Sequence, residues 1–513
     1  MSEIVDSAIK KATKGTTLIL AGTVAGALLL LVNKILIVRN TTKEELGTYT
    51  LAVAIVSVLA LIATLGVHEG IARYVSLFLA KDNAGEADSR SRAAIRIAIA
   101  SSVIAGFTLY FGSGFLSSLV FKNPALIMPL KIISVSVPFF VMTQILNAIL
   151  RGHGMITPKV CFIDIGIPLF FLFLLGGILL LNMSFISILY AYLFSIIFGF
   201  IAVGSYGYRN IGLNPFRLRN ARRQGELLLF SLPLLIGIVM AMIMKWMGIL
   251  MLGGCAGPKA VGVYEVSSSL SLLMMIPLAA LEYAFLPVAG TLHGRGQSEE
   301  LKRTYQVLAK LVFSATVPIF FTLFLFPEAV ITTLFGERFN DAAPALRVLS
   351  CGFLFHSLWG PNGILMVVIG MPKEISSVSI FGAVLNIVLN CILIQFYELG
   401  IMGAAIAIAG TYVGLNIVVS TVIYRKAGIQ PFTAAYLKSI MSAVFCMSFI
   451  LILRDYLPRY VWLIPFYLLL FILGYGFALL ITRSMDIEEI TIIKGIIARI
   501  KANGSPLRGR NHV

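Results

Sequence analysis

Charged residues are scarce in this 513-residue sequence, since only 12% of its residues are Asp, Glu, Lys or Arg. Soluble globular chains carry about 25% charged residues. Apolar residues instead make up 59% of the chain, which is more than one soluble core can bury. The mean hydropathy is +0.95. This balance excludes soluble enzymes and disordered scaffolds, and it predicts an all-α protein that crosses a membrane many times.

Cysteine and histidine are also sparse, with five of each. The cysteines are scattered through apolar stretches without CxxC spacing, a pattern typical of small hydrophobic residues rather than of disulfides or metal ligands. The sequence lacks a GxxxxGK[ST] nucleotide-binding loop as well. We therefore expect no metal ion, no cofactor and no direct use of ATP.

Long apolar runs take the place of these features. Fourteen segments are each long enough to cross a bilayer. They cover residues 16–38, 47–79, 94–113, 125–150, 160–181, 184–207, 227–253, 260–288, 307–333, 345–369, 375–396, 402–424, 435–453 and 461–482. Segments 47–79 and 260–288 are too long for one straight span, so we expect them to protrude or to break, the first at Gly66 and Gly70.

The basic residues indicate how these segments are oriented. The net charge of +17 would suit a nucleic-acid partner, but Lys and Arg also concentrate in the cytoplasmic loops of membrane proteins. With the N-terminus inside, the predicted cytoplasmic segments hold 28 Lys and Arg, the external loops hold 7 and the spans hold 5. This bias predicts a multi-pass protein with both termini cytoplasmic and no nucleic-acid partner.

Three segments outside the spans have patterns of their own. Residues 1–14 place apolar side chains at helical spacing beside lysines, which predicts an interfacial helix on the cytoplasmic membrane surface. Residues 209–226 are rich in arginine and read as a basic cytoplasmic linker between two halves. Residues 483–513 begin with an amphipathic pattern, so we expect a cytoplasmic tail lying on the membrane.

The two halves of the chain resemble each other. The sequence LGTY at 46–49 opens the second span, and VGVY at 261–264 opens the eighth. PAL occurs at both 124–126 and 344–346, before the fourth and tenth spans. Offsets of 215–220 residues predict a repeat of six spans, with an N-lobe at 15–208 and a C-lobe at 227–424. Because six is even, a pseudo-twofold axis along the membrane normal would relate the lobes, and 435–482 adds two further helices.

Several stretches carry a resemblance to a known family. They are FSLPLLIG (230–237), VGVYEVSSSL (261–270), FLPVAGTLHGRGQSEELKRTY (285–305), LFGERFNDAAPALRVLSCG (334–352), VLNIVLNCILI (384–394) and GIMGAAIA (400–407). With the fourteen spans, they make the chain similar to the polysaccharide (O-antigen-type) flippases of the multidrug/oligosaccharidyl-lipid/polysaccharide exporter superfamily. The sequence departs from many relatives at Lys245, where those relatives carry an acidic residue.

This resemblance implies two six-helix lobes around a cavity that opens to each side of the membrane in turn. It implies a flippase rather than an enzyme, moving a lipid-linked oligosaccharide from the inner to the outer leaflet. The expected partners are a glycan on polyprenyl phosphate or pyrophosphate, membrane lipids and glycan-assembly enzymes. The protein would act as a monomer in the plasma membrane of a bacterium or archaeon.

Ionisable residues inside the spans are the candidates for a binding site, because a charge in a membrane is costly. Lys34 and Lys245 lie about 19 residues into the first and seventh spans, and at the repeat offset of 215 Lys245 maps to position 30, one turn from Lys34 and on the same face. Arg73 lies near the inner end of the second span. Together they would bind a phosphate headgroup. The alternative is that each long side chain reaches the nearer interface, or that Arg73 is neutralised by Glu69 four residues earlier.

Three residues are secondary candidates. Arg347 begins the tenth span from outside, and Asn386 and Asn390 share one face of the eleventh. The asparagines fit interhelical hydrogen bonding better than sugar contacts. Five carboxylates near span ends are expected to form structural pairs or to face lipid headgroups rather than to couple protons, namely Glu69, Asp164, Glu265, Glu282 and Glu328.

Two other functions compete with the flippase. A multidrug and toxin extrusion-type antiporter would share the superfamily, but such chains usually have twelve spans and a buried acidic site. A polytopic glycosyltransferase or polymerase would need catalytic groups on a sizeable external loop, and the predicted external loops here are short.

Overall fold

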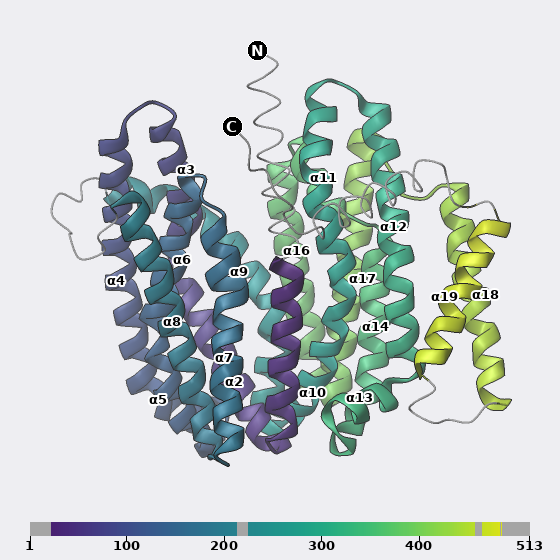
Figure 1. Cartoon of the computed structure of the whole chain (residues 1–513), viewed down its shortest axis with the longest axis horizontal. Coiled ribbons are helices and arrows are strands. Elements are labelled where there is room, and N and C mark those ends of the chain that lie inside the picture. The colour runs from purple at the N-terminus through teal and green to yellow at the C-terminus, as the bar shows by residue number, and fades with distance from the viewer. Residues whose placement is uncertain (1–21, 213–223, 457–463, 483, 485–513) are drawn as a thin grey trace, which may run out of the picture.

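A computed structural model of the chain describes residues 22–212, 224–456, 464–482 and 484. All regular elements within these ranges are helical (Figure 1). The predicted segments 1–14 and most of 209–226 and 483–513 lie outside the described residues, and their predicted structure remains a prediction.

The helices run roughly parallel to one another (Figure 1). A first helix is described over Gly22–Arg39. It is followed by α2 (Lys43–Ala63), α3 (Val67–Leu79), α4 (Ala84–Phe115), α5 (Ile127–Ser134), α6 (Ser136–Gly152), α7 (Ile167–Leu180), α8 (Phe185–Ile211), α9 (Gln224–Cys255), α10 (Gly257–Ser271), α11 (Ile276–Gly294), α12 (Ser298–Leu325), α13 (Pro327–Phe335), α14 (Ala343–Ser357), α15 (Asn362–Ile369), α16 (Pro372–Asn390), α17 (Gly400–Ala427), α18 (Ala434–Tyr456) and α19 (Ile464–Ile481). Short 3-10 or π turns join or extend them at η1 (Leu116–Val120), η2 (Pro124–Leu126), η3 (Lys159–Gly166), η4 (Leu272–Met275), η5 (Glu337–Ala342) and η6 (Cys391–Phe396).

The predicted spans correspond to these helices. Within the described ranges, 12 helices are long and apolar enough to cross a membrane, and a pair bent by 43° at residue 135 raises the number to 13. A shorter apolar helix, Phe466–Ile481, matches the fourteenth predicted segment. The chain is therefore a multi-pass, all-α membrane protein.

Several of the predicted spans are divided between two helices. The segment 47–79 divides between α2 and α3 at Gly66, whose φ of 71° suits glycine, as predicted. The segment 260–288 changes to a 3-10 turn at Leu272–Met275 between α10 and α11. The segment 345–369 also breaks, at the Gly360–Pro361 pair, because Gly360 has a φ of 56° and Pro361 lacks a backbone donor.

The helices form two groups (Figure 1). The N-lobe contains α2 to α8, and the C-lobe contains α10 to α17. α9 contacts both lobes, since it packs against α2 and α3 as well as against α16 and α17. α18 and α19 stand at the edge of the C-lobe and pack against α12, where Phe321 stacks on Phe471 at 4.2 Å between ring centroids.

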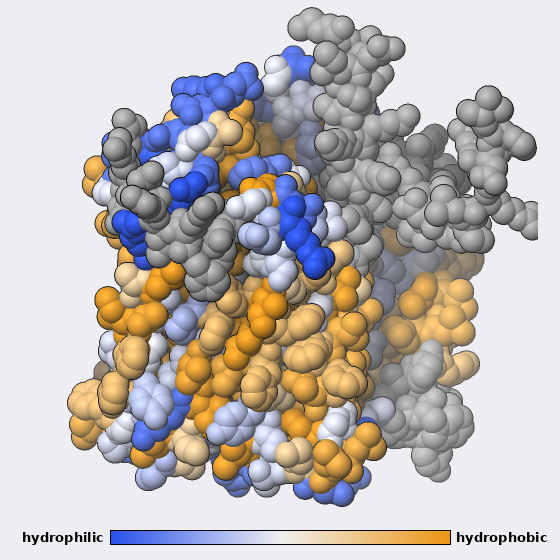
Figure 2. Space-filling model, turned by 60° about the vertical axis from the view of Figure 1, so that its left-hand side comes forward, coloured by the Kyte–Doolittle hydropathy of each residue, from blue (hydrophilic) through white to orange (hydrophobic). Residues whose placement is uncertain are grey.

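The side of the molecule is apolar. Figure 2 shows a hydrophobic band across one side, with hydrophilic residues concentrated toward the two ends. Large apolar side chains of the N-lobe are exposed there, including Phe107, Phe111, Phe173 and Leu180. Such a band matches the hydrocarbon layer of a bilayer. We call the end that carries Arg39–Lys43 and η5 the outer end, following the predicted orientation, and the opposite end the inner end.

Candidate functional site

The two lobes touch closely at the outer end, where α2 packs against α10. Gly47 of α2 and Gly262 of α10 permit this approach. A Cβ atom added to Gly47 would lie 1.7 Å from the carbonyl oxygen of Pro258, and one added to Gly262 would lie 2.1 Å from that of Lys43. Both distances are far below normal contact, so only glycine fits at this crossing. These glycines are the repeat-related positions of LGTY and VGVY.

Two arginines join the lobes at the same end by donating hydrogen bonds to backbone carbonyl oxygens. The Arg39 guanidinium donates to the carbonyl oxygen of Leu334 at 2.9 Å. In return, Arg338 donates to the carbonyl oxygen of Val38 at 2.7 Å. Each arginine thus binds the backbone beside the other, and together they join the end of the first helix to α13 and η5.

A salt bridge completes these contacts, with Lys43 Nζ 2.7 Å from Asp341 Oδ2. We refer to these residues together as the outer seal. The outer seal consists of Arg39, Lys43, Gly47, Gly262, Arg338 and Asp341. In this structure the outer end is closed between the lobes.

Lys34 lies on the first helix about 8 Å inward of Arg39, at a rise of about 1.5 Å per residue. Its ammonium forms an ion pair with Glu265 of α10. The two side chains are only 20% and 13% exposed. Glu265 also accepts a hydrogen bond from Ser269 Oγ at 3.1 Å. The alternative interpretation requires Lys34 to extend to the nearer interface. Lys34 instead turns to Glu265.

Lys245 stands close to this pair. Its ammonium lies 4.9 Å from the centroid of the Trp246 ring, a cation–π arrangement. Its electrostatic neighbours are Glu265 and Lys34. Lys245 therefore lies within electrostatic range of Lys34 and Glu265, although no hydrogen bond or ion pair links it to either of them among the described residues. We call Lys34, Lys245 and Glu265 the cationic cluster, because two ammonium groups and one carboxylate leave a net charge of +1.

Arg73 lines a separate cleft nearer the inner end, with a volume of about 530 Å³. Its guanidinium lies 4.9 Å from the centroid of the Phe230 ring of α9. The cleft is lined by Glu69, Arg73, Phe230, Leu234, Gly237, Ile238 and Ala241. Arg73 thus packs against α9, and Lys245 belongs to that helix at a different depth.

One face of α9 connects the cleft with the cationic cluster. Leu234, Ile238, Ala241 and Lys245 are separated by four, three and four residues, so they lie along the same side of the helix. From Leu234 to Lys245 this face rises about 16 Å. The first three line the cleft, and Lys245 follows them toward the outer end.

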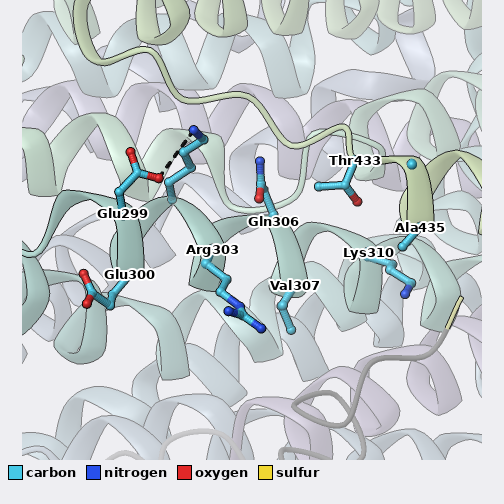
Figure 3. A pocket seen from close by; sticks show the side chains of 10 residues that line it. Glu299, Glu300, Arg303, Gln306, Val307, Lys310, Thr433 and Ala435 are labelled. Atoms are coloured by element: carbon cyan, nitrogen blue, oxygen red, sulfur yellow. Dashed lines mark ion pairs between the residues drawn. The ribbon is translucent and has the colours of Figure 1, made fainter.

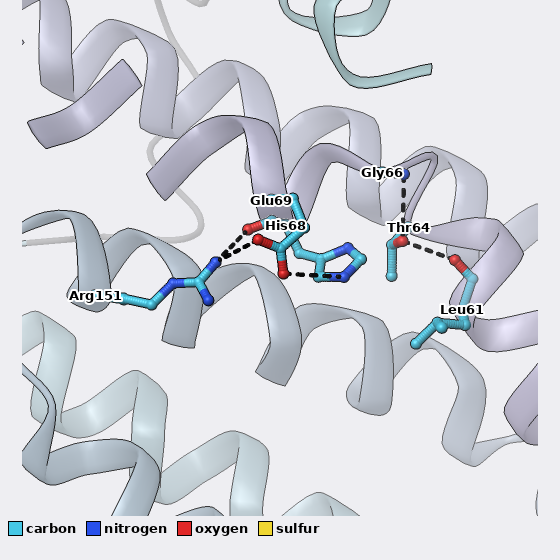
Figure 4. A network of polar contacts seen from close by, with 6 residues as sticks. All are labelled: Leu61, Thr64, Gly66, His68, Glu69 and Arg151. Atoms are coloured by element: carbon cyan, nitrogen blue, oxygen red, sulfur yellow. Dashed lines mark hydrogen bonds and ion pairs between the residues drawn. The ribbon is translucent and has the colours of Figure 1, made fainter. Parts of the chain in front are cut away.

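Glu69 forms its ion pair with another arginine, Arg151 (Figure 4). Arg151 at the end of α6 donates to Glu69 Oε2 at 3.0 Å and to the carbonyl oxygen of His68 at 3.3 Å. The side chain of His68 approaches the other Glu69 oxygen at 3.9 Å. In the part of the chain that the structure describes, no carboxylate forms an ion pair with Arg73, so the local neutralisation considered from the sequence does not occur.

The secondary candidates make structural contacts. Arg347 binds both carboxylate oxygens of Glu328, at 2.7 and 3.0 Å. Asn386 donates to Thr411 Oγ1 at 3.1 Å, and Asn390 donates to the carbonyl oxygen of Asn386 at 2.8 Å. Both asparagines are buried between α16 and α17. Asn386 therefore forms the predicted kind of interhelical hydrogen bond, whereas the hydrogen bonds of Asn390 stay within α16 and its Oδ1 is buried without a partner among the described residues.

Carboxylate pairing is general in the spans. Of the five carboxylates expected to form structural pairs, four do so, and the pairs are Glu69–Arg151, Asp164–Lys159, Glu265–Lys34 and Glu328–Arg347. The sequence did not distinguish Glu265 from the rest. Its helical pattern carries no mark of the contact with Lys34, which is 231 residues away.

A further pocket of about 640 Å³ opens at the inner end, between α12 and the start of α18 (Figure 3). Its charges are mixed, and Glu299 approaches Lys302 at 3.6 Å. It lies within the C-lobe and its neighbouring helix, so it does not join the two lobes. Among the described residues there is also no group of three or more His, Cys, Asp or Glu side chains arranged for a metal ion.

Solved structures of similar fold are membrane transporters. An inward closed structure of the lipid II flippase MurJ matches with a TM-score of 0.71 and 15% identity, covering 89% of this chain and 97% of that one. An inward-facing multidrug resistance MATE family transporter of the MOP superfamily matches with a TM-score of 0.67 and 18% identity, covering 79% and 94%. At these identities the likeness establishes the fold alone.

Relatives by sequence include two archaeal proteins. The probable low-salt glycan biosynthesis flippase Agl15 of Haloferax volcanii is 23% identical over 50% of this chain and 51% of its own length. The uncharacterized membrane protein MJ1068 of Methanocaldococcus jannaschii is 25% identical over 42% and 41%. The chain spans about half the length of these curated relatives or less. The model of the polysaccharide biosynthesis protein family matches residues 36–344, more than half of the chain. The chain therefore belongs to the polysaccharide biosynthesis protein family, in agreement with the resemblance noted from its sequence.

Proposed function

We propose that this protein is a flippase that moves a lipid-linked oligosaccharide from the inner to the outer leaflet by alternating access. The observation that carries this proposal is the cationic cluster between the lobes. Two lysines and one carboxylate lie there at membrane depth. A net positive charge facing lipid would cost several kcal/mol, whereas the same charge beside a wet path attracts an anion.

The substrate class follows from the sign of this charge. Between a polyprenyl carrier and a sugar, a phosphate diester carries one negative charge and a pyrophosphate diester carries two, and each accepts hydrogen bonds from several ammonium groups. The lipid-linked glycan would present such a headgroup on its polyprenyl carrier. A cationic drug would instead meet net repulsion from Lys34 and Lys245, so the multidrug antiporter is the weaker hypothesis.

A route for the headgroup is supported by the arrangement of the cations. Arg73 lies in the inner cleft and would capture the phosphate first. The α9 face from Leu234 to Lys245 then leads to the cationic cluster. Because the outer seal closes the path beyond Lys34, the present state would receive substrate from inside. Release would require the lobes to part at the outer end.

The relatives support the glycan as cargo. Agl15 is described as a probable flippase of low-salt glycan biosynthesis, and the family model is one of polysaccharide biosynthesis. We infer that this protein acts as a monomer in the plasma membrane of a bacterium or archaeon, with both termini cytoplasmic. Enzymes that assemble the glycan would supply its substrate.

Substitution of the two lysines tests the proposal. In cells that depend on this chain, export of the lipid-linked glycan should fall about 10- to 100-fold in the Lys34→Ala, Lys245→Ala double variant, because charge-assisted contacts of about 1.5–3 kcal/mol are lost. Lys-to-Arg changes should be milder because they keep the charge. Surface labelling of the glycan measures export, and immunoblotting measures protein abundance.

Lys131→Ala provides the control. This lysine is also in a span, but its ammonium lies 5.7 Å from the centroid of the Tyr110 ring, within the N-lobe. Its loss should leave export unchanged. Normal export by the double variant would refute the anion site.

A further inference from the structure

The first helix is tied to both lobes by consecutive residues. Asn33 Nδ2 donates to the carbonyl oxygen of Pro168 in α7 at 2.8 Å, and this contact is buried. The next residue, Lys34, pairs with Glu265 of α10. The helix is thus fixed to the N-lobe on one side and to the C-lobe on the other. The ion pair is a bridge between the lobes.

This bridge lies directly inward of the outer seal. From Gly257, where α10 begins, Glu265 is about 12 Å along the helix axis. The seal residues Arg39 and Arg338 join the same first helix to the C-lobe at the rim. If the lobes part at the outer end, Lys34 and Glu265 are carried apart together with the seal. Opening therefore requires the ion pair to break.

We propose that Glu265 is an internal stand-in for the substrate phosphate, holding Lys34 and the closed outer end until the substrate anion displaces it. This inference rests on the proposed function, because it assumes that the cationic cluster binds an anion. It assigns Glu265 a gating role. The carboxylate that competes with the substrate, the ion pair that bridges the lobes and the outer seal all lie near the outer end.

The charges explain how displacement would work. The pyrophosphate of a lipid-linked glycan carries two negative charges, so in the cationic cluster it meets two ammonium groups and offers Lys34 more negative charge than one carboxylate does. Like-charge repulsion then disfavours Glu265 at the same site. Ser269 lies one turn further along α10 and donates to Glu265 already, so the released carboxylate keeps a hydrogen-bond partner. Lys34 turns to the substrate, and the lobes lose their bridge.

Two substitutions separate a stand-in from a simple structural contact. Glu265→Gln and Lys34→Gln both remove the ion pair, so both should open the outer end. They should change anion binding in opposite directions. Glu265→Gln removes the competitor and keeps both lysines, whereas Lys34→Gln removes a ligand for the anion. If the ion pair had only a packing role, both substitutions would weaken closure of the outer end and anion binding together.

Opening is measured with spin labels across the outer seal. Labels at Asn40→Cys and Glu337→Cys, in a background without the native cysteines, report the separation between the first helix and η5. In proteoliposomes the unsubstituted protein should give mainly the short distance. Both glutamine variants should increase the population of the longer distance about fivefold or more, within the usual range for coupled sites.

Binding is measured with radiolabelled farnesyl pyrophosphate as the probe. Glu265→Gln should bind it roughly fivefold more tightly or better, and Lys34→Gln about tenfold more weakly. Glu374→Gln is the matched control, because it neutralises a carboxylate that pairs with Lys426 between α16 and α17 of the C-lobe alone. This control should change neither measurement.

The outcomes separate the two proposals. If Lys34→Gln weakens probe binding but Glu265→Gln does not tighten it, the anion site stands and the stand-in is refuted. If neither variant alters probe binding, the anion site itself is wrong, and the stand-in fails with it. If the outer distance remains short in both variants, the ion pair does not hold the seal and the gating role is refuted.

Discussion

The crossing of α2 and α10 offers a direct way to disturb the closed state. We expect Gly262→Ala to shift the protein toward an open outer end. A Cβ at this position would lie 2.1 Å from the carbonyl oxygen of Lys43, whereas a carbon and an oxygen in contact need about 3.3 Å. The helices must therefore separate locally by about 1.2 Å. The backbone carbonyl cannot rotate away as a flexible side chain would.

The magnitude follows from the cost of overpacking. Forcing an extra methyl into a tight contact costs about 1–3 kcal/mol. That penalty applies only to the state in which α2 and α10 touch, so it lowers the closed population about 5- to 150-fold relative to the open one. The spin-label pair Asn40→Cys and Glu337→Cys measures this ratio in proteoliposomes.

A matched glycine provides the control for this experiment. Gly176 of α7 has no atom within 4 Å of an added Cβ, so Gly176→Ala should leave the distance distribution unchanged. Gly47→Ala should act like Gly262→Ala, since its Cβ would meet the Pro258 carbonyl oxygen at 1.7 Å. If both seal variants keep the short distance while remaining folded, the crossing of α2 and α10 does not set the closed state.

Two further predictions concern orientation and driving force. Single cysteines at Asn123 and Gln224, in a background without the native cysteines, should react with impermeant reagents from outside and inside respectively, and the reverse pattern would refute the predicted topology. Flipping of a fluorescent lipid-linked glycan in proteoliposomes should accelerate when the receiving side is made positive. Each negative charge gains about 2.3 kcal/mol per 100 mV. A rate that does not respond to potential of either sign would exclude this driving force.

The sequence predicts most of the fold because the physics of spans is local. A membrane-length apolar run and a glycine such as Gly66 are visible within a short window, and both determine structure where they occur. The division between α14 and α15 is equally local, because Gly360 adopts a positive φ and the proline that follows it, Pro361, has no backbone donor.

The candidate binding site is predictable in part, because the depth of a lysine within a span is also visible in the local sequence. The sequence places Lys34 and Lys245 at similar depth in equivalent spans of the repeat, and in the structure Lys245 lies within electrostatic range of Lys34. Their shared carboxylate is a contact between distant parts of the chain, for which one sequence holds no signal. Arg73 shows the opposite case. Its spacing from Glu69 suggests a local pair, but the end of α6 brings Arg151 to that carboxylate instead.

The charge of the cationic cluster gives the proposed cycle a direction. With Lys34, Lys245 and Glu265 ionised, the empty cluster carries +1, and a bound pyrophosphate diester with its two negative charges makes it −1. An inside-negative potential favours moving the loaded, negative assembly toward the outside. It also favours returning the empty, positive assembly toward the inside. Both halves of the cycle are then driven by the same potential, provided that the two lysines outnumber the carboxylate. A second carboxylate in the cluster would cancel the empty charge and remove the drive for the return step, so the basic residue at position 245 matters to the proposed mechanism beyond its contact with the substrate.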